Sequence, residues 1–439
     1  MTIPESPRYG RKPWRWASLA LGLLGLAGVL TWWSLGWPSP KPWRLSVALN
    51  TFYDAGEVAY SPDGRTIATP GIRMIPPFAK DFPKGLIPEY GASQGIVELR
   101  DAATGAKVKD LGFDPLHGAT SVRPIVFSPD GTLVVAGDWC EQCSQSTPLL
   151  KVWEVASGRL VATLELPTGS PREVSFSGDG RIFLALTETQ TGWPTPHRVL
   201  RWETATWTPI EGMSIPLKGV YATALAPGGD LLAATQLGEN PVILIEIPTG
   251  REMARITPTM PPNVIAPSPN LRFSPDGRTV VAAKPLGEVD LLDVPTGMVR
   301  ASIPRDKDRL DTFPKIAFSP GGRTLALGDT YLPAEDTGSR LARALYSLIG
   351  VNMPQPTIVG RVTFVDVATG RRQSGFDGVQ SRLTRLTFSP DGRTLVIDGN
   401  PPAVAAAGSG VTAGLATVAA GPDNARTLIF WDVPVVPLK

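Results

Sequence analysis

The sequence predicts an all-β fold, a seven-bladed β-propeller built of four-stranded antiparallel blades and preceded by one N-terminal transmembrane helix. Two observations predict it. A short turn string occurs seven times along the 439 residues, at spacings that leave room for about four strands each. Near the N-terminus, residues 16–37 form a run of 22 residues that contains no charged side chain.

The recurring string is SPDG or a close variant, and each copy joins two predicted strands. An alternating apolar segment precedes it and a run rich in β-formers follows it, as in VAYSPDGRTIAT. Proline fixes its own φ, aspartate hydrogen-bonds within its turn, and glycine adopts a positive φ, so the string is a tight turn. The copies begin at Ser61, Ser128, Ser177, Ala226, Ser274, Ser319 and Ser389.

A second string follows each copy and completes the blade. It contains an aromatic or apolar residue followed by an acid, as in VWEVASG and LDVPTG, and it predicts a third strand, after which a segment such as RLVATLEL gives a fourth. One four-stranded sheet cannot bury both of its faces alone. Repetition of the sheet therefore predicts blades stacked around an axis.

The two ends of the propeller are predicted to share one blade. The chain ends after the third strand of the seventh repeat, whereas residues 43–49 match residues 158–164 of a fourth strand position for position. We therefore expect Leu45–Leu49 to be the outermost strand of the last blade and to pair with the segment near Leu428–Val433. This pairing leaves no bare sheet edge at the point of closure.

The repeats resemble the WD-repeat family over residues 44–439. Trp153-Glu154, Trp202-Glu203 and Trp431-Asp432 stand at that family's Trp-Asp position, and Asp293 and Asp366 keep the acid. The resemblance implies a propeller that binds proteins or peptides. The family's Gly-His pair is absent, with His117 in PLHG the only approximation, and periplasmic TolB-like propellers, which also use SPDG turns, are the alternative branch.

The N-terminal region predicts a membrane anchor. Residues 1–15 are basic, residues 16–37 are long enough for a membrane-spanning helix flanked by tryptophans, residues 38–43 form a proline-rich linker, and residues 44–439 form the propeller. The positive-inside rule places the N-terminus in the cytoplasm and the propeller outside it, in the periplasm or the extracellular space. A cleaved signal peptide is the alternative interpretation.

Three long insertions mark one part of the ring. They are residues 70–95, 329–360 and 398–426, in the first, sixth and seventh repeats, and a shorter one covers residues 138–149 in the second. All lie between the second and third strands. In the family that the chain resembles, these connections share a face with the links between blades, which implies one wall of loops over blades 6, 7, 1 and 2. We expect this wall to bind a partner, although loops also lengthen without a function.

Within the insertions, a few side chains are candidates for partner contacts. Residues 334–350 predict a short amphipathic helix, with leucines on one face and arginines on the other, which either packs on the propeller or is presented to a partner. The candidate partner-binding residues are Trp139, Tyr331, Arg340, Arg343 and Leu345.

The sequence contains few groups suited to catalysis. Cys140 and Cys143 form the sharpest local motif; outside the cytoplasm a local disulfide is favoured over zinc binding, redox chemistry or free thiols. With only two histidines, no catalytic triad can be assembled, and we predict no catalytic, cofactor-binding or metal-binding residues and no cofactor. The formal net charge of +2 does not indicate the basic surface that nucleic-acid-binding proteins have.

The sequence therefore favours a membrane-anchored, extracytoplasmic propeller that binds a protein or peptide partner and is not an enzyme. Two other classes of function remain open. One is a propeller enzyme of the lactonase or quinoprotein-subunit type, with a site at the channel mouth. The other is a purely structural protein of the cell envelope.

Overall fold

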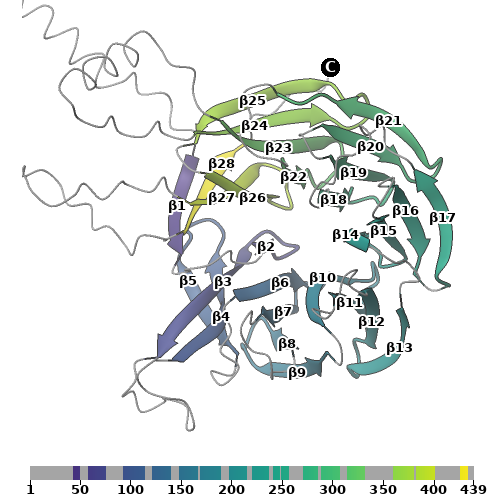
Figure 1. Cartoon of the computed structure of the whole chain (residues 1–439). Helices are drawn as coiled ribbons and strands as arrows, with labels where there is room; N and C mark the ends of the chain where they lie inside the picture. The colour runs from purple at the N-terminus through teal and green to yellow at the C-terminus, as the bar shows by residue number, and fades with distance from the viewer. Residues whose placement is uncertain are drawn as a thin grey trace, which may run out of the picture. The chain divides into compact units, whose positions relative to one another are not determined.

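The fold is all-β, and the prediction of seven four-stranded antiparallel blades is confirmed. The computed structural model describes residues 43–49, 58–75, 92–113, 121–139, 148–166, 169–188, 197–214, 220–236, 241–247, 249–256, 270–284, 288–306, 314–331, 359–379, 382–400 and 426–433. Within Leu45–Lys439, which forms one compact unit, seven separate sheets each contain four hydrogen-bonded strands. In Figure 1 the first strand of each blade lies toward the middle of the ring and the fourth lies at its rim.

The strands follow the repeats of the sequence. The strands of blades 1 to 3 are β2 Ala59–Tyr60, β3 Thr66–Ile75, β4 Ala92–Asp101, β5 Lys107–Gly112, β6 Ser121–Phe127, β7 Leu133–Trp139, β8 Leu149–Glu154, β9 Leu160–Glu165, β10 Ser170–Phe176, β11 Ile182–Glu188, β12 His197–Glu203 and β13 Thr208–Ser214. Those of blades 4 to 6 are β14 Val220–Leu225, β15 Leu231–Gln236, β16 Val242–Glu246, β17 Arg251–Ile256, β18 Asn270–Phe273, β19 Thr279–Ala283, β20 Val289–Asp293, β21 Met298–Ile303, β22 Lys315–Phe318, β23 Thr324–Tyr331, β24 Val359–Asp366 and β25 Arg372–Val379.

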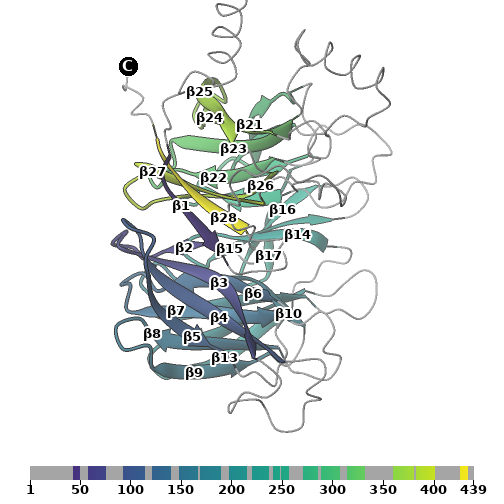
Figure 2. The same cartoon turned by 90° about the vertical axis from the view of Figure 1, so that its left-hand side faces the viewer.

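Blade 7 joins the two ends of the propeller. It consists of β26 Arg382–Phe388, β27 Thr394–Asn400, β28 Arg426–Asp432 and, as its outermost strand, β1 Trp43–Leu49. Figure 2 shows β1, in purple, beside β28, in yellow. The predicted closure by residues 45–49 is thus confirmed, and the strand starts two residues earlier.

The core consists of the interfaces between blades. Apolar side chains of neighbouring sheets form one cluster at each interface, including the interface between blades 7 and 1, so the ring is closed. The second and third strands supply most of these side chains, and β19, for example, is buried along its whole length. Such strands are apolar on both faces because each face packs on another sheet.

Each complete SPDG string folds as the tight turn that its residues predict. In the first blade, Ser61 Oγ donates to Asp63 Oδ1 at 2.6 Å and accepts from the Thr66 backbone N–H at 2.9 Å, while Gly64 has a φ of 71°. The Ser61 hydroxyl holds the pKa of the Asp63 carboxyl below its ordinary value. The turns are therefore structural elements that join the first and second strands.

Among the described residues, no helix is long and apolar enough to cross a membrane. The predicted transmembrane segment, residues 16–37, lies outside the described residues, as do residues 334–350, for which a short amphipathic helix is predicted.

Candidate functional site

The alternation of strand direction sorts the connections into two faces of the ring. The first and second strands of each blade are antiparallel, as are the second and third. The SPDG turns therefore lie on one face, together with the turns between third and fourth strands. All second strands end, and all third strands begin, at the opposite face, and we call this the loop face. The four insertions predicted from the sequence all leave the ring on the loop face, from the ends of β3, β7, β23 and β27.

The strands that carry the long insertions in blades 1 and 6 are extended toward the loop face. The second and third strands pair over ten residues in blade 1 and over eight in blade 6, against seven in blade 3 and five in blades 4 and 5, which carry no predicted insertion. Residues 70–75 and 92–95, which we expected to belong to an insertion, are part of this ladder. The insertions of blades 1 and 6 thus start from β-ribbon stalks, whereas the corresponding ladders of blades 2 and 7 cover only five and six residues.

Tyr331 stands at the end of the stalk of blade 6. Its ring lies 4.3 Å from Cζ of Arg361, a cation–π contact between β23 and β24, and both side chains are half-buried. This places the predicted contact residue Tyr331 at the loop face. Trp139 ends β7 and pairs with Ser121, so its backbone is also at the loop face.

The remaining candidates, Arg340, Arg343, Leu345, Cys140 and Cys143, lie outside the described residues. Their predicted roles in partner contacts and in a disulfide bond stay predictions.

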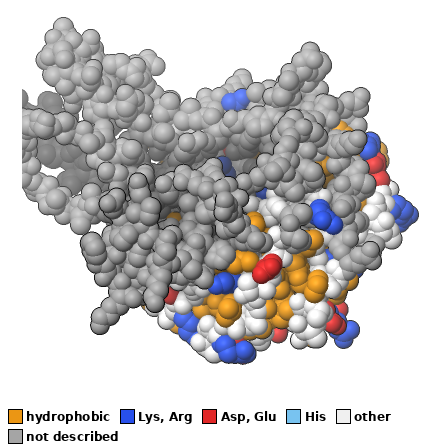
Figure 3. Space-filling model, turned by 60° about the horizontal axis from the view of Figure 1, so that its bottom comes forward, with side chains coloured by type: hydrophobic (Ala, Val, Ile, Leu, Met, Phe, Trp, Pro, Cys, Tyr) orange, Lys and Arg blue, Asp and Glu red, His pale blue; other side chains and the backbone are white. Residues whose placement is uncertain are grey.

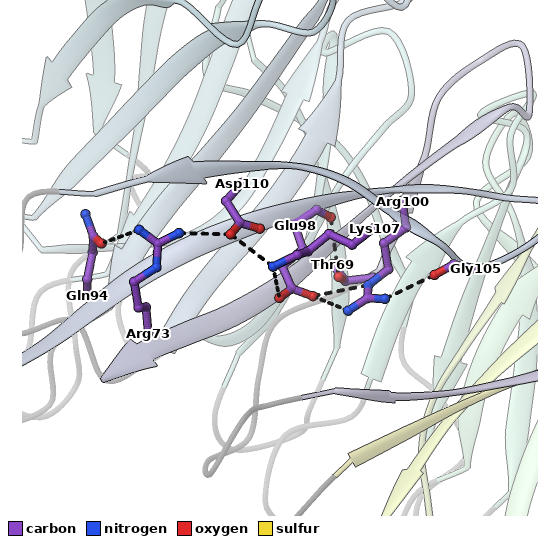
Figure 4. Close-up of polar contacts among 8 residues, drawn as sticks. All are labelled: Thr69, Arg73, Gln94, Glu98, Arg100, Gly105, Lys107 and Asp110. Atoms are coloured by element: carbon purple, nitrogen blue, oxygen red, sulfur yellow. Dashed lines mark hydrogen bonds and ion pairs between the residues drawn. The ribbon is translucent and has the colours of Figure 1, made fainter. Parts of the chain in front are cut away.

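The stalk of blade 1 carries a polar network, which Figure 4 shows along β3, β4 and β5. Arg73 Nη2 lies 2.8 Å from Asp110 Oδ2, and Arg73 Nη1 donates to Gln94 Oε1 at 3.4 Å. Gln94 in turn donates to the carbonyl of Phe113 at 2.6 Å. The base of this stalk is therefore held by side chains from three strands, in addition to its backbone ladder.

A second set of polar groups lies on the innermost strands. Glu173 on β10 is half-buried, and its Oε2 accepts a hydrogen bond from the backbone N–H of Leu225 on β14 at 3.0 Å. A β-bulge between Pro171 and Glu173 shifts the register there, which changes the direction in which the following side chains point. Burial raises the pKa of Glu173 to about 8, although the Leu225 N–H acts against this rise.

Among the side chains that the structure describes, three cations lie on the innermost strands of the consecutive blades 5, 6 and 7. They are Arg272 on β18, Lys315 on β22 and Arg385 on β26, all half-buried. Burial and the nearby charge of Arg385 lower the pKa of Arg272 to about 10. Asp398, which is buried, pairs directly opposite Arg385 in the sheet.

None of these inner-strand groups belongs to a recognisable motif of the sequence. They stand two or four residues before the turn string, at positions where other blades carry small residues such as Ala59 and Ala222. In the sequence, each of these groups is a charged residue in a strand that otherwise alternates apolar and small residues. This pattern indicates a group near the ring axis only once the first strand of every blade is known to be the innermost one.

The exposed apolar side chains give a weaker indication of a binding surface. Figure 3 shows apolar side chains gathered on the described part of one face, with charged side chains among them and at the margin. Among the described residues, the most exposed large apolar side chains lie on outermost strands: Val108, Leu160, Met253, Met298 and Val299. These strands belong to four different blades, so the loop face remains the better candidate site.

Within the part of the chain that the structure describes, no group of three or more His, Cys, Asp or Glu side chains is arranged to hold a metal ion. Comparison with models of known protein families gives no match, and comparison with curated proteins gives none either. The likeness to the WD-repeat family therefore rests on the motifs in the sequence and on the seven-bladed fold.

Proposed function

We propose that this protein is a binding module, a membrane-anchored propeller outside the cytoplasm whose loop face over blades 6, 7, 1 and 2 holds a protein or peptide partner. We also propose that it acts by binding rather than by catalysis. The single observation that carries the proposal is the pair of extended stalks in blades 1 and 6. Loops that carry binding residues are commonly positioned by rigid scaffold elements.

The stalks are neighbours across blade 7, which carries the third long insertion. Blade 7 contacts blade 6 through one apolar cluster and blade 1 through another. The three long insertions therefore leave adjacent parts of the ring, and a partner can contact all of them at once. An interface of ordinary size buries about 800 Å² on each side, more than one such loop offers alone.

Tyr331 and Arg361 also favour the loop face as the partner-binding surface. Tyrosine and arginine are enriched among the residues that dominate binding energy, because each combines a large contact area with directed hydrogen bonds. Their mutual cation–π contact holds both side chains in place before a partner arrives. A partner with an acidic or aromatic group at its centre fits this pair.

The test is a comparison of full-length protein with variants in which residues 76–91, 332–358 and 401–425 are each replaced by a short Gly-Ser turn. Proteins captured with the intact chain from membranes are identified, purified and then titrated against each variant. We expect affinity to fall by about tenfold or more in the variants of blades 1 and 6. The matched control replaces residues 237–240, the short connection of blade 4 on the same face, and keeps full affinity. Equal affinity in all variants would overturn the proposal.

Topology is tested separately. A protease added from outside intact spheroplasts should cut within residues 332–358 and 401–425, because the anchored propeller lies outside the cytoplasm. Protection of both segments until detergent is added would contradict the proposed location, while leaving partner binding itself untouched.

A further inference from the structure

The innermost strands carry more positive than negative side chains. Among the described side chains of these strands, Glu173 is the one acid. The cations are Arg123, Arg172, Arg272, Lys315 and Arg385. Burial raises the pKa of Glu173 to about 8, so its carboxyl is mainly uncharged near neutral pH. In the sequence, Glu57 stands at the same distance from its turn string as Glu173; it lies outside the described residues, and the cations outnumber the acids even when it is counted.

Two hydrogen bonds between blades show which way side chains of the innermost strands point. Glu173, four residues before its turn string, accepts from the backbone N–H of Leu225 in the next blade at 3.0 Å. Thr387, two residues before its turn string, donates from its hydroxyl to the carbonyl of Val58 in blade 1 at 3.5 Å. Residues two apart lie on the same face of a strand. Side chains at both positions therefore point from their own blade toward the next one around the ring.

Cations occupy these two positions in three consecutive blades. Lys315 of blade 6 and Arg385 of blade 7 stand four residues before the turn string, and Arg272 of blade 5 stands two residues before it. Figure 1 shows their strands, β18, β22 and β26, in succession along the inner edge of the ring. We call these three side chains the inner cation cluster.

Two influences act against the positive charge of Arg272. Burial removes its guanidinium from water, and the nearby charge of Arg385 repels it; together they lower the pKa of Arg272 to about 10. Because this repulsion acts between blades 5 and 7, the two guanidinium groups approach each other past blade 6, which carries Lys315. An anion bound among these three groups would turn the repulsion into attraction.

Two buried acids on second strands lie close to the inner cation cluster. Asp398 pairs directly opposite Arg385, so the two side chains lie on the same face of blade 7. Asp329 pairs directly opposite Arg361, a cation of its own sheet. The inner cation cluster and Asp398 together carry two net positive charges. An anion with two negative charges matches this balance.

We propose that the inner cation cluster is a binding site for a small oxyanion with two negative charges, either a phosphate group or a dicarboxylate. The planar N–H fork of arginine matches the oxygen pairs of both groups, and lysine adds a compact positive charge. All three side chains are half-buried, so a small ion reaches them while the surrounding protein strengthens the attraction. This site is separate from the loop face and does not depend on a partner there.

Isothermal titration calorimetry of the full-length protein in detergent micelles tests the site. Sodium phosphate, sodium malonate and sodium formate are titrated separately near neutral pH, in about 150 mM sodium chloride. We expect phosphate or malonate to bind saturably, with about one anion per chain, and formate to bind at least roughly tenfold more weakly because it carries a single charge. Tighter binding of phosphate or of malonate identifies the class of ligand. If neither binds saturably, or formate binds equally well, the proposal is wrong.

Variants locate the bound anion. Arg272→Gln, Lys315→Met and Arg385→Gln should each weaken binding roughly tenfold, because each removes a charge-assisted hydrogen bond. The matched control is Arg278→Gln, which removes an exposed arginine from the turn of blade 5 and should keep the affinity of the wild type. Binding that the three inner substitutions leave unchanged, or that the control weakens equally, shows an adventitious ion only and overturns the proposal.

Thermal unfolding keeps the test decisive if a variant folds poorly. Phosphate or malonate, whichever binds, should raise the melting temperature of the wild type and of Arg278→Gln, and should raise that of the inner variants less. A glutamine variant that does not unfold cooperatively is replaced by Arg272→Lys or Arg385→Lys. Lysine keeps the charge but lacks the fork, so binding should weaken by roughly threefold or more. Lysine variants that bind as tightly as the wild type would contradict the proposed role of the guanidinium groups.

Discussion

The backbone N–H of Leu225 donates a hydrogen bond of 3.0 Å to Oε2 of Glu173, and this contact joins the innermost strands of blades 3 and 4. Burial raises the pKa of Glu173 from the ordinary value of 4.5 to about 8. The carboxyl is therefore mainly protonated at neutral pH, and its acceptor oxygen still serves the Leu225 N–H. A neutral side chain of the same shape can replace it.

Glu173→Gln should stabilise the protein at alkaline pH. The folded state keeps the proton to a higher pH than the unfolded state, so the stability of the wild type declines as pH rises from 4.5 to about 8. Glutamine does not titrate, and its side-chain oxygen can still accept from Leu225. We expect a higher free energy of unfolding for the variant at about pH 8.5 and little difference at about pH 4, measured by urea denaturation.

The control is Glu165→Gln on the outer strand β9, where the side chain is exposed. It should leave the pH dependence of stability as it is in the wild type. A Glu173→Gln protein that loses stability at alkaline pH would show instead that the carboxylate is ionised and needed.

Gly321→Asp should stabilise blade 6. In blade 7, Asp391 Oδ1 accepts from Ser389 Oγ at 2.5 Å and from the Arg393 N–H at 3.0 Å, whereas the turn of blade 6 has glycine in that place. A Cβ built on Gly321 meets no atom within 4 Å. The new carboxylate should restore both hydrogen bonds and raise the free energy of unfolding by about 1 kcal/mol, measured by urea denaturation.

The neighbouring glycine provides the opposite control. Gly322 has a φ of 68°, so Gly322→Asp should lower the free energy of unfolding by about 1 kcal/mol. Equal effects of the two substitutions would mean that the turn hydrogen bonds contribute nothing measurable.

The left-handed backbone at Trp207 should carry a conformational cost that alanine keeps and glycine relieves. Trp207 has a φ of 56°, where Gly250 in the equivalent turn has 71°, and its ring centroid lies 5.8 Å from that of Phe183. Trp207→Ala and Trp207→Gly both lose the ring, but only glycine relieves the left-handed backbone. We therefore expect the alanine variant to be less stable than the glycine variant by about 1 kcal/mol in denaturant unfolding. The reverse order would contradict this account.

The fold could be predicted from the sequence because its determinants are local and repeated. Ser61, Asp63 and Gly64 specify a turn by their own hydrogen bonds and backbone preferences, and six further copies fix the number of blades. The closing strand could be predicted because residues 43–49 match another fourth strand, residues 158–164. The length of the blade 1 stalk could not. Pro70 and Gly71 are typical strand breakers, yet their pairing with Val97 and Ile96 continues the ladder.

The inner-strand groups could not be predicted because they depend on contacts between distant repeats. Glu173 accepts a hydrogen bond from Leu225 in the next blade, and the charge of Arg385, two blades away, helps to lower the pKa of Arg272. Each of these pairs is separated by 50 residues or more in sequence. Nothing local distinguishes such a side chain from one on a solvated strand until the ring is assembled.

Removal of β1 should open the last blade. A chain that begins at Asn50 leaves the outer edge of β28 without its partner, whereas a chain that begins at Lys41 keeps the pairing with Trp43–Leu49. Loss of the backbone hydrogen bonds between β1 and β28, and of the burial that comes with them, should lower the free energy of unfolding by roughly 4 kcal/mol. It should also expose a strand edge that favours self-association. Thermal unfolding and analytical ultracentrifugation of the two chains measure both effects. A synthetic peptide with the sequence of residues 41–50 should restore the melting temperature of the shorter chain by strand addition, whereas a scrambled peptide should not. If the two chains melt alike and both remain monomeric, β1 is not needed to close the ring.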